Sequence, residues 1–297
     1  MSGVAQIDRC ILGSIANRTG PYMKSFSAHP FESLLVWATA LMTLAGFWNL
    51  YFGHGSGANP YHHLHFSTVS LWLVLLLVQL ALIGNRPSSM HRKVGLCVLL
   101  AAPLLVASAA LPWVEWARKG VASGRGDFMV VQNVMGTLQL ALIIVLAFAL
   151  RRRRQLHAAF IVSTALLFMA IAMFFSLVGF VPGFRVEGPE TFYRFGKALA
   201  TVQYAIIAVG ALFFAKDPRH GWPFLLVGVS FSANELLKAW LTRRGLLEPL
   251  TELVGSLNQP LVFAGGFVAI LVLLMATGVW KTGRAGNPLK PDPLRAG

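Results

Sequence analysis

Long, nearly uncharged apolar runs constrain the fold of this chain more than any other feature of its sequence. A helix that crosses a membrane needs about 20 apolar residues, because the hydrocarbon core is about 30 Å thick and a helix rises about 1.5 Å per residue. The sequence has eight such runs, at residues 31–53, 64–84, 94–116, 128–150, 158–180, 196–215, 222–242 and 260–280. We therefore predict an all-α, polytopic membrane helix bundle with about eight transmembrane helices.

The runs divide the chain into three parts. Residues 1–30 are polar and mixed in charge, and we expect a cytoplasmic tail, either flexible or forming a helix on the membrane surface. Residues 31–280 form the predicted transmembrane bundle. Residues 281–297 are rich in Gly, Pro and basic side chains, which predicts a disordered cytoplasmic tail. The two cysteines, Cys10 and Cys97, are too far apart in this scheme to predict a disulfide framework or a clustered zinc site.

The distribution of charge predicts the orientation of the bundle. With the N-terminus inside, most of the 25 Lys and Arg residues fall in cytoplasmic segments, and most of the 11 acidic residues fall outside. This asymmetry is typical of polytopic membrane proteins. It predicts an inner-membrane protein with both termini in the cytoplasm, and it explains the net charge of +14 without a nucleic-acid partner. The run Arg151–Arg154 is interpreted as a topology anchor, which could also bind anionic lipid headgroups.

Four histidines open four of the apolar runs at intervals of 62–66 residues: His29, His91, His157 and His220. The spacing predicts four repeated helical hairpins, with one histidine per repeat at the cytoplasmic face. A second sign of duplication is the segment Gln-Leu-Ala-Leu-Ile, which occurs at both 79–83 and 139–143.

The densest pattern lies in the second and third runs. His65, Trp72 and Gln79 are spaced by seven residues and so share one helix face, and His91-Arg92-x-x-Gly95 opens the next run. This pattern resembles a class of bacterial multi-pass membrane proteins that has no established activity, and it is distantly similar to haem-binding b-type membrane cytochromes.

Two later motifs of that class are matched less fully. Leu156-His157 follows a basic run, but Ala158 and Ala159 stand where a basic residue is usual. Asp217-x-Arg219-His220 is followed by glycine instead of proline. The resemblance covers roughly residues 60–225 and implies the multi-pass fold, but no activity.

The histidines are candidates for binding haem b or a transition metal. Neutral imidazole is a good ligand for haem iron, copper and zinc, and a b-type haem needs two histidines at similar depth on different helices. His91 and His157 satisfy this requirement, with Gln79 and Gln139 as supporting hydrogen-bond donors. The alternatives are structural histidines at the membrane interface, which the sequence favours, and a role in proton transfer.

A weaker metal candidate lies at the predicted outer face. His62 and His65 stand beside His54 and His63, and they share a helix face if the helix begins by Pro60. A solvated loop is the alternative interpretation.

A few polar residues lie inside the predicted spans. Asn234, Glu235 and Lys238 interrupt the seventh run, and the spacing of the two charged residues allows an ion pair on one helix face. Polar groups at membrane depth are costly, so these three residues either form a structural cluster or mark a polar path. Gln79, Gln132, Asn133 and Gln139 are candidates for interhelical hydrogen bonds.

Three functions remain open from the sequence. The first is a non-catalytic subunit that packs against other membrane proteins in the lipid bilayer. The second is a haem- or metal-binding redox protein that uses His91 and His157. The third is a transporter of protons or small solutes. The sequence lacks a Walker loop, a dinucleotide glycine fingerprint and a Gly-x-Ser-x-Gly elbow, so it does not point to a particular reaction.

Overall fold

The computed structural model describes residues 29–52, 57–83, 89–124, 127 and 129–278. The described residues are helical almost throughout and contain no strand. The predicted N-terminal tail and C-terminal tail lie outside them, apart from His29 and Pro30, as do His54 and the side chain of Arg92.

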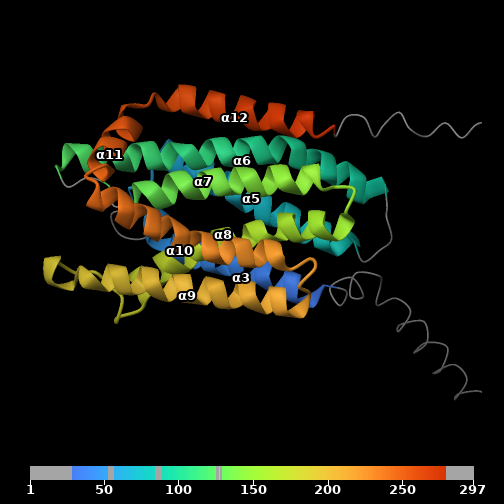
Figure 1. Ribbon diagram of the computed structural model, residues 1–297, viewed down its shortest axis with the longest axis horizontal. Coiled ribbons are helices and arrows are strands. Elements are labelled where there is room, and N and C mark those ends of the chain that lie inside the picture. Colours follow the sequence, from blue (N-terminus) through green and yellow to red (C-terminus); the bar gives the residue numbers. More distant parts are fainter. Residues whose placement is uncertain (1–28, 53–56, 84–88, 125–126, 128, 279–297) are drawn as a thin grey trace, which may run out of the picture.

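The helices run lengthwise beside one another and form a single bundle (Figure 1). Their bounds are α3 (Pro30–Gly46), α4 (Trp48–Tyr51), α5 (Pro60–Ile83), α6 (Ser89–Ala122), α7 (Val130–Ala149), α8 (Arg154–Phe180), η1 (Pro189–Thr191), α9 (Tyr193–Lys216), α10 (Trp222–Arg243), α11 (Leu247–Ser256) and α12 (Gln259–Ala276). Seven of them are long and apolar enough to span a membrane: α5, α6, α7, α8, α9, α10 and α12. The predicted all-α polytopic bundle is confirmed.

The first predicted span is interrupted in the structure. Helix α3 is apolar but has only 17 residues, and the chain turns at Phe47 before the short helix α4 begins. At about 1.5 Å per residue, α3 is about 25 Å long and so falls short of the hydrocarbon thickness. Gly46, the last residue of α3, contacts the backbone of α8. A Cβ atom at this position would lie 2.5 Å from the carbonyl oxygen of Ala172, so only glycine allows this close approach.

Helix α8 is the central helix of the bundle. It contacts α3, α5, α7, α9 and α10, and its buried side chains include Phe160 and Leu166, which are fully enclosed. A second, smaller core of Val114, Ala117, Val130, Val131 and Val254 joins α6, α7 and α11. In an apolar solvent such close packing, rather than hydrophobic burial, holds helices together.

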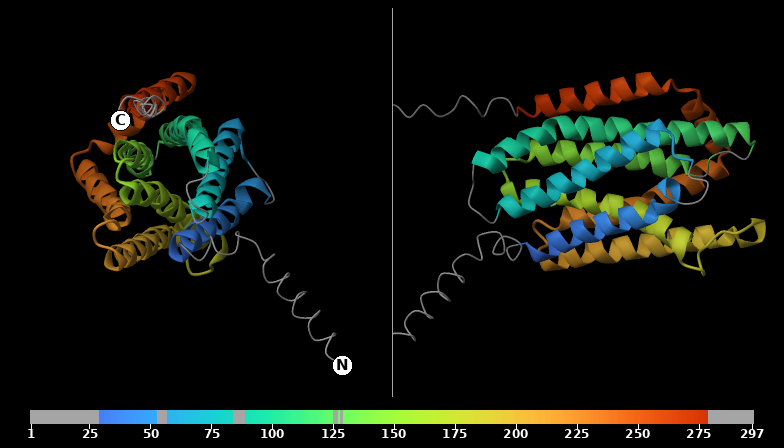
Figure 2. Two further views of the ribbon diagram at one scale, coloured as in Figure 1. Left: turned by 90° about the vertical axis from the view of Figure 1, so that its right-hand side faces the viewer. Right: turned by 180° about the vertical axis from the view of Figure 1, so that it is seen from behind.

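The two ends of the bundle are distinguished by the chain termini. Helix α3 begins and α12 finishes at the same end, which we call the terminal end (Figure 1). Because α6, α8 and α10 also begin there, His29, His91, His157 and His220 all belong to the terminal end. The four hairpins are nevertheless packed differently, because α12 lies against α6 at the edge of the bundle rather than against α10 (Figure 2).

Helix α11 lies between the predicted spans 222–242 and 260–280, where no helix was predicted. Its apolar residues recur at Leu247, Leu250 and Val254, which is a helical period, and they pack into the smaller core. Helix α11 thereby joins the end of α10 to the start of α12 across the extended C-terminal part of α6.

Candidate functional site

A network of amide side chains joins α7 to α10. Gln132 and Gln139 are two turns apart on α7, and Asn234 of α10 lies between them. The Nδ2 atom of Asn234 donates to Oε1 of Gln132 at 3.0 Å and to Oε1 of Gln139 at 3.3 Å. In return, Nε2 of Gln139 donates to Oδ1 of Asn234 at 2.8 Å. Asn234 is almost completely buried, at 2% exposure, so these bonds are its compensation for leaving water.

The network continues to a charged pair. The Nε2 atom of Gln132 donates to Oε1 of Glu235 at 2.8 Å and to the carbonyl oxygen of Phe231 at 3.1 Å. The other carboxylate oxygen of Glu235 lies 2.5 Å from Nζ of Lys238, three residues along the same helix. The predicted ion pair is therefore present. Its two opposite charges cancel, which lowers the cost of placing either of them within the membrane.

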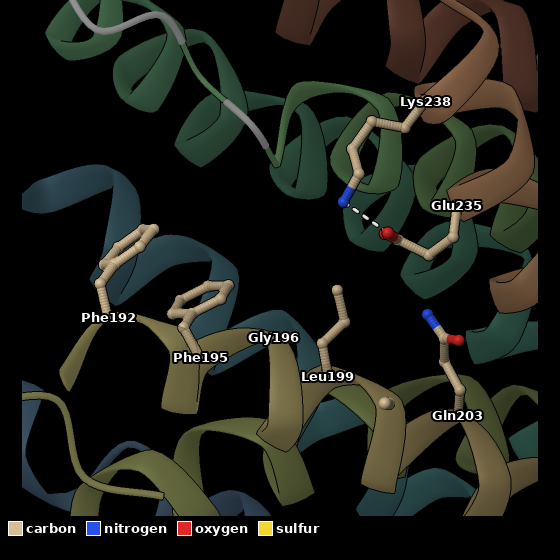
Figure 3. Close-up of a pocket in the computed structure, with 8 residues that line it drawn as sticks. Phe192, Phe195, Gly196, Leu199, Gln203, Glu235 and Lys238 are labelled. Carbon is tan, nitrogen blue, oxygen red and sulfur yellow. Dashed lines mark ion pairs between the residues drawn. The ribbon is translucent and has the colours of Figure 1, made fainter. Parts of the chain in front are cut away.

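The charged pair faces a pocket between α9 and α10. The pocket has a volume of about 400 Å³, within the usual range for small-molecule sites. Figure 3 shows Gln203 of α9 pointing across it toward Glu235. The lining residues are Phe192, Phe195, Gly196, Leu199, Ala200, Gln203, Glu235 and Lys238. One wall of the pocket is thus apolar and partly aromatic, and the other carries both charges.

Close packing of α9 on α10 at the terminal end restricts the pocket to the opposite end. Gly210 and Gly228 allow the two backbones to touch, because a Cβ atom on either one would lie within 2.9 Å of a carbonyl oxygen on the other helix. The rings of Phe213 and Phe224 stack beside them, with centroids 4.1 Å apart. Small residues commonly mediate such contacts between membrane helices.

The depth of the pocket follows from the position of Glu235 in its helix. Thirteen residues separate it from Trp222 at the terminal end, and eight separate it from Arg243 at the opposite end. At about 1.5 Å per residue these separations are about 20 Å and about 12 Å. Glu235 is therefore well inside α10 but nearer the opposite end, and Lys238 is one turn nearer still.

The histidines at the terminal end have separate local partners. The Nδ1 atom of His157 donates to the carbonyl oxygen of Ala147 at 2.7 Å, which leaves Nε2 as the acceptor nitrogen of the neutral ring. The ring of His220 lies 2.8 Å from the carboxylate of Asp217. Gln79 donates to the carbonyl oxygen of His91 at 3.4 Å, a weak bond that does not involve the imidazole.

Gln79 lines a small cavity that neither His91 nor His157 lines. The cavity beside Gln79 has a volume of about 20 Å³, roughly the space of one water molecule, and Trp72 and Val98 also line it. Gln139, the second expected donor, is bonded to Asn234 on α10. Ligation by His91 and His157, with Gln79 and Gln139 as supporting donors, stays a prediction.

The histidines of the opposite end also have individual partners. Helix α5 begins at Pro60, as the shared face of His62 and His65 requires. However, Nδ1 of His62 accepts from the backbone N–H of Asn59 at 3.3 Å, and Nδ1 of His65 lies 3.2 Å from the hydroxyl of Ser108 on α6. Across the described ranges of the chain, no group of three or more His, Cys, Asp or Glu residues is placed to hold a metal ion.

The stripe of His65, Trp72 and Gln79 faces the bundle interior. Trp72 is buried and its indole N–H donates to the hydroxyl of Thr164 on α8 at 2.8 Å. All three side chains of this stripe thus lie within hydrogen-bonding distance of groups on neighbouring helices.

Two arginines bind the chain on either side of α12, Arg118 just before the helix and Arg151 just after it. Arg118 donates to the carbonyl oxygens of Gly255 and Leu257 at 2.9 and 2.6 Å. Arg151 donates to the carbonyl oxygens of Thr277 and Gly278 at 2.5 and 2.6 Å. Arg151 therefore caps a helix end, a role that its membership of a basic run did not reveal.

Comparison with models of protein families found no match, and comparisons with curated proteins and with solved structures found none either. The fold and the site together define a polytopic membrane helix bundle with a charged, partly aromatic pocket between α9 and α10.

Proposed function

We propose that this protein is a membrane transporter or solute-binding protein, and that the pocket between α9 and α10 binds its solute. The observation that carries the proposal is the charged pair at membrane depth, which a hydrogen-bonded network from a second helix orients toward a pocket of about 400 Å³. Intramembrane charges are costly and commonly mark solute or ion paths.

The direction of the side chains supports a binding site over a purely structural cluster. Interhelical hydrogen bonds between α7 and α10 are already supplied by Gln132, Asn234 and Gln139. Glu235 and Lys238 add a charged surface on the α9 side of α10, and the side chain of Gln203 approaches from the other wall (Figure 3). A structural cluster alone would not require charges that line an open space.

Access of water to the pocket tests the proposal. With Cys10 and Cys97 replaced by serine, a cysteine is introduced either at Leu199, which lines the pocket, or at Leu236, which is 74% exposed on the outside of α10. We expect a charged methanethiosulfonate reagent to label Leu199→Cys at least about tenfold faster in intact membranes, because the outer face of α10 is covered by lipid. Equal labelling of the two positions would refute an aqueous solute site.

A further inference from the structure

The two charges at the pocket are held unequally. Glu235 accepts a hydrogen bond from Gln132, and Gln132 is itself held by the Phe231 carbonyl and by Asn234. Within the described parts of the chain, the ammonium of Lys238 forms an ion pair with Glu235. The carboxylate is therefore a fixed part of the site, whereas the ammonium is attached through one contact at the end of a flexible side chain.

The two charges also differ in what happens when they separate. Lys238 is one turn nearer the opposite end of the bundle, and a lysine near a helix end can extend its ammonium to the membrane interface. Glu235 has a shorter side chain, lies one turn deeper and accepts a hydrogen bond from Gln132 of α7, so its carboxylate cannot extend to the membrane interface in the same way. Displacing Lys238 from Glu235 by a cationic ligand therefore costs much less free energy than displacing Glu235 from Lys238 by an anionic ligand.

The rest of the lining suits a cation with an organic body. Phe192 and Phe195 stack with centroids 5.8 Å apart and line the pocket across from the charged pair (Figure 3). Aromatic faces attract cations, and the attraction is stronger where water is excluded. Leu199 and Ala200 supply further apolar surface, and Gln203 adds an uncharged amide.

We infer that the ligand of this pocket is an organic cation, and that Lys238 is an internal substitute which occupies the ligand's place at Glu235 when the pocket is empty. This inference rests on the proposed function, because it assigns the chemical class of the solute. Binding is then an exchange of two cations at one carboxylate. The charge at Glu235 is unchanged by this exchange, and the extra positive charge is carried by Lys238, which extends toward the interface, where water solvates it.

Equilibrium binding of two probes of the same shape and opposite charge tests the inference. The full chain is purified, and radiolabelled tetraphenylphosphonium and tetraphenylborate are each bound to the wild type and to Lys238→Met. We expect Lys238→Met to bind the phosphonium about tenfold tighter, because the competing internal cation is gone. Lys197→Met is the matched control, since Lys197 lies on α9 over Phe184 and away from the pair, and its affinity should equal that of the wild type.

Two further variants separate the possible failures. Glu235→Gln and Leu199→Trp should each abolish phosphonium binding, the first by removing the charge and the second by filling the pocket without touching the polar network. Circular dichroism melts establish that each variant is folded. Unchanged or weaker phosphonium binding in Lys238→Met overturns the cation assignment. If the wild type binds tetraphenylborate and Leu199→Trp abolishes that binding, the cation assignment is overturned but the proposed solute site is kept. If Leu199→Trp changes the binding of neither probe, the cation assignment and the proposed function are both overturned.

Discussion

The Nε2 atom of Gln132 on α7 lies 2.8 Å from the Oε1 atom of Glu235 on α10, so one helix holds the charge carried by another. The amide of Gln132 is fixed in turn by Asn234, which also bonds to Gln139. Three amide side chains thus orient a single carboxylate toward the pocket between α9 and α10.

Asn234 is the residue on which the amide network depends. Asn234→Leu should lower the free energy of unfolding by about 1–3 kcal/mol, because it removes the donor to Oε1 of Gln132 and the partner of both polar atoms of the Gln139 amide. Unfolding in sodium dodecyl sulfate measures the change. Ser230→Ala is the control on the same helix, because the Ser230 hydroxyl donates to the carbonyl of Val227 within that helix, one turn earlier. Equal effects of the two substitutions would contradict a special role of the network.

Two glycines should respond to alanine with opposite sign. A Cβ atom at Gly210 would lie 2.6 Å from the carbonyl oxygen of Phe224, so Gly210→Ala must push α9 away from α10 and should cost about 1–3 kcal/mol. A Cβ atom at Gly136 on α7 would instead meet open space, so Gly136→Ala should stabilise the helix by about 0.5–1 kcal/mol. Thermal denaturation in detergent distinguishes them. A stabilised Gly210→Ala would mean that the helices are not in contact there.

The hold of Arg118 on the segment before α12 can be tested by hydrogen exchange. Arg118→Ala removes the donors to the carbonyls of Gly255 and Leu257, and it should speed exchange of the amides in α11 and at the start of α12. Lys119→Ala is a suitable control, because Lys119 pairs with Glu115 on the surface of its own helix and such pairs contribute little. If both variants exchange alike, Arg118 does not secure this junction.

The turn before α10 should be sensitive to acid. The pKa of Asp217 lies below its ordinary value, chiefly because the His220 side chain donates a hydrogen bond to its carboxylate. A depressed carboxyl pKa contributes stability that is present above the ordinary pKa and is lost as the pH falls through the folded value. Asp217→Asn should therefore flatten the acid side of a plot of stability against pH, below about pH 4. Thermal melts across that range measure the slope, and an unaltered acid limb would show that the pair has no such effect.

The class of fold was predictable because membrane spans are local. About 20 apolar residues in sequence suffice to place a helix in the bilayer, whatever the other helices do. All eight predicted runs contain a helix, and seven of these helices are long enough to span. The prediction for the first run was less accurate, because the contact of Gly46 with α8 and the turn at Phe47 depend on a helix more than a hundred residues away.

The site was predictable only in fragments. The spacing of Glu235 and Lys238 indicated an ion pair within one helix, and the structure contains it. Helical spacing alone could not show that Gln132 bonds to Glu235, or that Gln139 bonds to Asn234. Those partners lie on different helices, and the choice among them depends on how the helices are rotated and packed.

By itself the sequence thus determined the seven spanning helices, the membrane environment and the end of the bundle to which each histidine belongs, because length, hydrophobicity and alternation of direction are properties of consecutive residues. Only the tertiary structure decided which polar side chains meet. The close approach of α9 and α10 at Gly210 and Gly228 leaves the pocket at their other end, next to Glu235 and Lys238. Such contacts are set by the fit of surfaces between helices, which no local pattern in the chain records.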